Sequence, residues 1–62
     1  MTFHVYVDKE KFNGVSCFAI NAEYYDTSDG VVSFGNKDNK AVASFASDYV
    51  SGIVMIEDEN ER

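Results

Sequence analysis

The chain has one histidine and one cysteine, the two side chains best suited to acid–base or nucleophilic chemistry near neutral pH. The strand pairing predicted below places His4 across from Glu23, and a histidine beside a carboxylate can move protons when a pocket holds substrate next to it. The same pairing places Cys17 across from Glu10, with no histidine beside its thiol. We therefore interpret His4 and Glu23 as a surface pair and predict no catalytic residue.

Metal binding has equally little support in the sequence. One cysteine and one histidine do not make a zinc site. Asp26, Asp29 and Asp38 lack the spacing of a calcium loop, D-x-D-x-D-G with a later glutamate, so we interpret them as turn formers. The sequence predicts no metal, no cofactor and no enzyme activity.

The length of 62 residues indicates a single domain that buries little surface. Small domains compensate for the low stability of a small core with a disulfide, a metal or a partner subunit. Cys17 has no second cysteine to pair with. We therefore expect a homo-oligomer, specifically a two-fold dimer with Tyr49 and Met55 in its interface. No apolar run is long enough to span a membrane, and the N-terminus is not typical of a signal peptide. With a single thiol, this predicts a cytoplasmic protein.

Eleven acidic residues against five basic ones give a net charge of −6. This charge disfavours binding to nucleic acid and to anionic membranes, and it suits a protein partner with a basic surface. The predicted acidic surface serves either solubility or imitation of a nucleic-acid backbone. Its residues are Glu23, Asp26, Asp29, Glu57, Asp58 and Glu59.

Residues 30–45, GVVSFGNKDNKAVASF, have the pattern of a β-hairpin. A turn at 38–39 places Phe34 opposite Ala43 and Val32 opposite Phe45, which gathers these side chains on one face. A slip of one residue would scatter them over both faces, so the pattern itself favours this register. The polar residues of the turn tolerate the backbone angles that it needs.

A second hairpin is predicted at the N-terminus. Residues 2–8 alternate between apolar and polar, as in a half-buried strand. Asn13-Gly14 is a strong two-residue turn signal. Centring the hairpin there pairs Val5 with Ala22 and Phe3 with Tyr24 on one face. The opposite side of the whole sheet is more apolar than solvent requires, which indicates a second covered surface. It carries Tyr6, Phe12, Val15, Cys17, Val31 and Val42, with Ala46 as a further candidate.

Together with a short strand at 53–56, these segments predict an all-β fold. We expect a five-stranded antiparallel meander over residues 1–56, closed into a small barrel or left as an open sheet. Residues 26–30 form a turn, and 47–52 connect to the last strand. An acidic, disordered tail is expected at 57–62. Apolar residues also recur at helical spacing near 39–51, so an α+β fold with a helix there is the alternative.

The run from Asn21 to Ile56 resembles small uncharacterised β-meander proteins of tailed phages and their bacterial hosts. The shared features are a turn, GVVSF, a polar turn, VASF, an aromatic residue and a terminal strand. Tyr49 stands where such proteins often have tryptophan. The resemblance implies a β fold and a phage setting, and it implies no catalytic residue.

The sequence therefore predicts a small acidic protein-interaction module, such as a phage accessory protein or inhibitor that binds a host or phage protein. Aromatic residues and methionine are common anchors of such interfaces. The candidates are Tyr6, Phe12, Tyr25, Tyr49 and Met55. The alternatives are a small β-barrel that stacks nucleic-acid bases on its tyrosines, and a structural subunit of a larger assembly.

Overall fold

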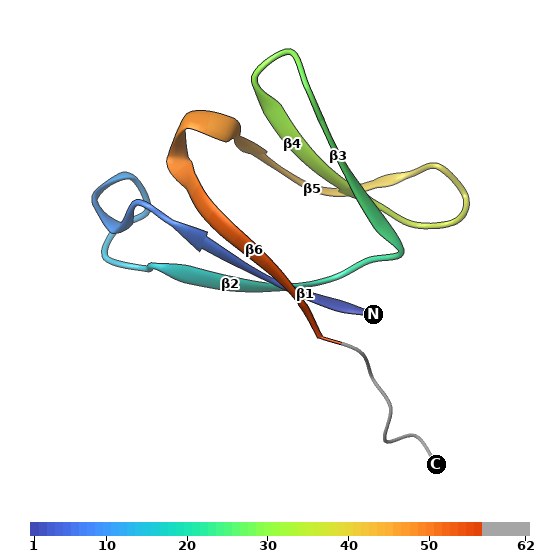
Figure 1. Ribbon diagram of the computed structural model, residues 1–62, viewed down its shortest axis with the longest axis horizontal. Helices are drawn as coiled ribbons and strands as arrows, with labels where there is room; N and C mark the ends of the chain where they lie inside the picture. Colours follow the sequence, from blue (N-terminus) through green and yellow to red (C-terminus); the bar gives the residue numbers. More distant parts are fainter. Residues whose placement is uncertain (57–62) are drawn as a thin grey trace.

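A computed structural model describes residues 1–56 and shows an all-β fold, which confirms the predicted fold class. The strands are β1 (Thr2–Val7), β2 (Cys17–Asn21), β3 (Tyr24–Ser28), β4 (Val31–Gly35), β5 (Ala41–Ala46) and β6 (Val50–Ile56). They form two antiparallel sheets, which we call sheet I (order β2-β1-β6) and sheet II (order β3-β4-β5) (Figure 1). The prediction of a single five-stranded meander is therefore wrong in detail, because the fold has six strands divided between two open sheets.

The alternative helix near 39–51 is wrong. Residues 41–46 are extended in β5, and only Ser47–Tyr49 makes a single 3₁₀ turn before β6 begins. Serines and β-branched or aromatic residues are mediocre helix formers, and pairing with β4 satisfies the main chain of this segment instead. Within residues 1–56 the chain has no α-helix.

Sheet II contains the predicted central hairpin in the predicted register. Val32 lies opposite Phe45 and Phe34 opposite Ala43, with an irregularity between Phe34 and Gly35. The turn between the strands is held by Asn36, whose side-chain oxygen accepts hydrogen bonds from the N–H groups of Asp38 and Lys40 at 3.0 and 3.3 Å. An asparagine that binds its own turn in this way fixes the chain reversal.

The third strand of sheet II accounts for the extra strand. Residues 26–28, predicted as part of a turn, belong to β3, which pairs with β4. Asp29 and Gly30 alone make the turn, with φ angles of 53° and 76°. Positive φ at both central residues matches the twist of a tight hairpin, and glycine adopts it without strain.

Sheet I differs from the prediction in register. The turn at Asn13-Gly14 is present, with φ angles of 59° and 91° and a hydrogen bond of 3.0 Å from the Val15 N–H to the Phe12 carbonyl. A 3₁₀ turn at Lys9–Lys11 precedes it, however, so the turn does not connect paired strands directly. Val5 is consequently paired with Phe18, which comes four residues before the predicted partner Ala22 in the sequence. Because the shift is even, the apolar side chains keep their face.

The last strand closes sheet I. β6 pairs with β1 rather than with β5, and it begins at Val50, inside the segment predicted as a connection. A register irregularity lies between Tyr6 and Val7, where the Ser51 hydroxyl donates to the Tyr6 carbonyl at 3.2 Å. The pairing joins the N-terminal strand to the end of the described chain.

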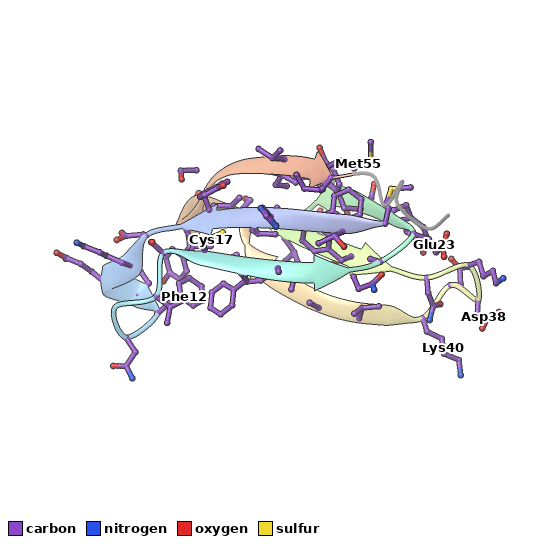
Figure 2. The ribbon with its side chains drawn as sticks, turned by 90° about the horizontal axis from the view of Figure 1, so that it is seen from below. Phe12, Cys17, Glu23, Asp38, Lys40 and Met55 are labelled. Carbon is purple, nitrogen blue, oxygen red and sulfur yellow. The ribbon has the colours of Figure 1, made fainter. Side chains whose placement is uncertain are left out.

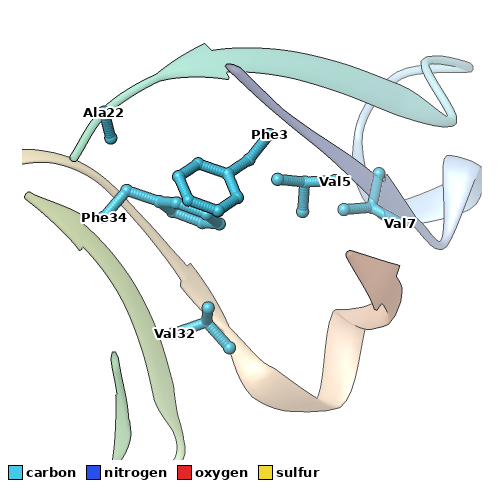
Figure 3. Close-up of a cluster of buried hydrophobic side chains, with 6 residues drawn as sticks. All are labelled: Phe3, Val5, Val7, Ala22, Val32 and Phe34. Atoms are coloured by element: carbon cyan, nitrogen blue, oxygen red, sulfur yellow. The ribbon is translucent and has the colours of Figure 1, made fainter. Parts of the chain in front are cut away.

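The core lies between the two sheets (Figure 3). Phe3 of sheet I contacts Phe34 of sheet II with ring centroids 5.4 Å apart, and Phe18 contacts Phe45 in the same way at 5.6 Å. Phe12 joins them, so all the phenylalanines of the chain pack together. The buried side chains are Phe3, Val5, Val7, Ala22, Val32 and Phe34.

Candidate interaction surfaces

The residues that could do chemistry are not brought together. His4 lies between Ala19 of β2 and Val54 of β6, so the predicted pairing of His4 with Glu23 is wrong. Cys17 lies opposite Tyr6 rather than Glu10. The four-residue shift in register is the cause of both differences.

Within residues 1–56 there is no ligand-sized pocket and no group of three potential metal ligands. In the same part of the chain, no helix is long and apolar enough to cross a membrane. The candidate binding surfaces of the described residues are therefore the outer surfaces of the two sheets.

The outer surface of sheet I is made of the side chains that alternate with the core row. Because Phe3, Val5 and Val7 are buried, their neighbours along β1 point outward, as do the residues paired with them. We call this surface the uncharged face. It consists of Thr2, His4, Tyr6, Cys17, Ala19, Asn21, Gly52, Val54 and Ile56.

The uncharged face has no Asp, Glu, Lys or Arg, although the chain has eleven acidic and five basic residues. Its largest apolar side chains are open to solvent: Tyr6 is 41% exposed, Val54 47% and Ile56 40%. Figure 2 shows β6, β1 and β2 side by side, with the charged residues Glu23, Asp38 and Lys40 at one end of the molecule. A charge-free surface with exposed apolar side chains, on a chain that is otherwise rich in charge, is typical of a protein interface.

The outer surface of sheet II differs in composition. Tyr24 lies across Gly35, so that a Cβ built on Gly35 would be 2.7 Å from the tyrosine oxygen. The Tyr24 hydroxyl donates to Asn39 Oδ1 at 3.0 Å. The surface, which we call the covered face, consists of Tyr24, Asp26, Ser28, Val31, Ser33, Gly35, Val42, Ser44 and Ala46. The hydroxyl oxygens of Ser33 and Ser44 are 3.2 Å apart, so this face satisfies several of its own polar groups.

Three of the predicted interface residues belong to aromatic clusters. Phe12 and Tyr49 contact each other at 6.0 Å, and the Lys11 ammonium lies 5.5 Å from the Tyr49 ring centre. Tyr25 packs edge-on against Phe3 at 5.5 Å. These aromatic contacts give Phe12, Tyr25 and Tyr49 partners within the chain.

The other two predicted interface residues are Tyr6 and Met55. Tyr6 lies on the uncharged face, and Met55 lies opposite Phe3 in β6. The five residues therefore do not form one continuous surface, and their role in binding stays a prediction.

The predicted acidic surface is also divided. Glu23 precedes β3 and Asp29 follows it, so the strand separates them by about 20 Å. Asp26 lies between them on the covered face. The remaining predicted members, Glu57, Asp58 and Glu59, lie outside the described residues, as does the predicted tail 57–62.

No protein-family model, no curated protein and no solved structure matches this chain. The resemblance to phage β-meander proteins therefore stays a prediction. The surface itself was only partly predictable, because alternation placed Tyr6 and Cys17 on an apolar outer side. The position of Val54 and Ile56 beside them depends on the pairing of β6 with β1, which no local sequence signal specifies.

Proposed function

We propose that this protein is a small interaction module that binds another protein through the uncharged face. The observation that carries the proposal is the absence of charged side chains across three adjacent strands of a chain with a net charge of −6. Tyr6, Val54 and Ile56 would be the apolar anchors, because aromatic and aliphatic side chains contribute most when a partner removes water from them.

The charge around the uncharged face supports a protein partner over a nucleic acid. The electrostatic attraction that dominates binding to a phosphate backbone comes from lysine and arginine, and this face has neither. Glu23 lies just beyond β2, and the chain as a whole is acidic, so the partner would have an apolar patch with basic residues around it. An accessory protein or inhibitor, in the phage setting that the resemblance implies, would act by covering such a patch on its target.

The test compares two valines with equal exposure. Val54 on the uncharged face and Val42 on the covered face are both 47% exposed in edge strands. Immobilised wild-type protein, Val54→Lys and Val42→Lys are each exposed to a bacterial lysate, and the captured proteins are identified by mass spectrometry. We expect one partner captured by the wild type and by Val42→Lys, and lost with Val54→Lys.

Three outcomes would contradict the proposal. Equal capture by all three proteins, or loss only with Val42→Lys, would remove the uncharged face as the binding surface. Direct binding of single-stranded DNA or RNA that weakens steeply with salt would favour the nucleic-acid class instead. Circular dichroism of both variants provides the control that the fold is retained.

A further inference from the structure

Within residues 1–56, the outer edge of β6 has main-chain groups that pair with no other strand. The Val7 N–H donates to the Ser16 carbonyl, and the Ala22 N–H donates to the Met1 carbonyl. The main-chain N–H and carbonyl groups of the odd-numbered residues of β1 therefore point toward β2. Main-chain groups alternate in direction along an antiparallel strand, so the even-numbered residues of β1 face β6.

The same alternation applies to β6. Gly52, Val54 and Ile56, which lie opposite these even-numbered residues, bond to β1. Ile53 and Met55 therefore direct their N–H and carbonyl groups away from the sheet. These groups are the ones available to a further strand.

This edge also lacks the features that normally prevent strand pairing. Such features are charged side chains, proline, bulges and cover from another element. The other three edge strands each have one of these features: β3 has the charged residue Asp26, and β2 and β5 contact each other. β6 has no charged residue and no proline, and its irregularity near Ser51 leaves residues 52–56 regular. Its Met55 side chain is 48% exposed.

We propose that β6 pairs in an antiparallel fashion with β6 of a second copy of this chain. The result would be a continuous six-stranded sheet across a two-fold axis, because identical strands in antiparallel pairing present the same groups to each other. A second copy fits this edge because a chain of 62 residues gains stability from a partner subunit.

The acidic sequence after Ile56 sets the direction of pairing. Antiparallel strands place the two Ile56 residues, each followed by the acidic sequence EDENER, at opposite ends of the pair, whereas parallel strands would place them together. Both copies carry a net charge of −6, so added salt should strengthen the dimer by screening their repulsion. The pairing uses the edge of sheet I and leaves the uncharged face open, so it is independent of the proposed function.

Amide hydrogen exchange of the intact chain, followed by NMR, tests the pairing at single residues. When about nine-tenths of the chains are paired, the Ile53 and Met55 amides should exchange about tenfold more slowly than in dilute protein. The Val54 amide bonds to β1 and should be protected at every concentration. The Thr27 amide, which faces away from β4 on the β3 edge of sheet II, should be unprotected throughout.

Two proline variants provide the second measurement. Met55→Pro removes an outward N–H from β6, and Thr27→Pro removes an outward N–H from β3 as the matched control. In analytical ultracentrifugation, Met55→Pro should be monomeric at concentrations where the wild type and Thr27→Pro are dimers. A monomeric wild type at all concentrations, or a dimer with unprotected Ile53 and Met55 amides, would overturn the proposal. If Met55→Pro does not fold, the exchange measurement decides.

Discussion

The outer faces of the two sheets both carry a glycine paired with a tyrosine, but the space around the glycine differs between them. Each has an outward-facing glycine and an outward-facing tyrosine, Gly35 with Tyr24 in sheet II and Gly52 with Tyr6 in sheet I. On the covered face the tyrosine ring lies on the glycine. On the uncharged face nothing lies within 4 Å of a Cβ built on Gly52.

The difference shows how a small sheet can satisfy one surface internally and leave the other for a partner. Tyr24 reaches Asn39 in the neighbouring turn, and Ser33 and Ser44 contact each other, so the covered face uses its own side chains. No hydrogen bond joins the Tyr6 hydroxyl to any residue in the described part of the chain. This contrast leads us to place binding on sheet I.

The largest effect is expected where the two sheets meet. Phe34 is fully buried and contacts Phe3 and Phe45, so Phe34→Ala should destabilise the fold by about 3–5 kcal/mol. That loss is comparable with the whole stability of a small domain, on the order of 5 kcal/mol. Urea denaturation followed by circular dichroism should show a largely unfolded chain, and both faces should be lost together.

The exposed Val42 provides the control for this prediction. Val42→Ala removes side-chain atoms that solvent already reaches, so its stability should change by less than about 0.5 kcal/mol. A Phe34→Ala protein within about 1 kcal/mol of the wild type, the average effect of a point mutation, would show that the sheets do not depend on this contact.

A pair of glycine substitutions should separate the two faces directly. Gly35→Ala forces the Tyr24 ring away and breaks its hydrogen bond to Asn39, with an expected loss of about 1 kcal/mol. Gly52→Ala meets open space and has no positive φ, so it should be neutral or stabilising by up to about 0.5 kcal/mol. Thermal melts measure both changes, and NMR of the Tyr24 ring protons reports the displacement. Equal effects of the two substitutions would remove the contrast between the faces.

The smallest effect is expected from removing single hydroxyl groups. Tyr24→Phe deletes the donor to Asn39 and should cost about 0.5 kcal/mol, since this hydrogen bond is exposed. Tyr6→Phe should leave the free energy of unfolding unchanged, because its hydroxyl has no protein partner within residues 1–56. Urea titrations of both variants against the wild type resolve the difference, and a larger loss for Tyr6→Phe would reverse the comparison.

Local pattern was sufficient to predict parts of this fold and insufficient for others. The β4–β5 register follows from Val32, Phe34, Ala43 and Phe45, because only one pairing places them on a common face. The short strand β3 was missed although Asp29-Gly30 is a hairpin turn signal, since the polar residues before it were assigned to the turn. Alternation and turn chemistry are local, so they predict neighbouring strands.

The N-terminal register shows how one local signal can conceal another. The turn at Asn13-Gly14 was correctly predicted, yet Asp8 also begins a 3₁₀ turn by accepting the Glu10 N–H at 3.0 Å. That turn moves β2 by four residues relative to β1. The candidate site depends on this register and on the pairing of β1 with β6, which joins residues far apart in sequence. Such contacts are set by packing of the whole chain.

We propose that the uncharged face is the surface that binds a protein. The most direct test is to add the captured partner to isotope-labelled wild-type protein and to map the amide chemical shifts by NMR. We expect the shifts to concentrate at Tyr6, Ala19 and Val54 and to leave Ser33 and Ser44 unchanged. Shifts concentrated at Ser33 and Ser44 on the covered face, with Tyr6 and Val54 unaffected, would contradict it.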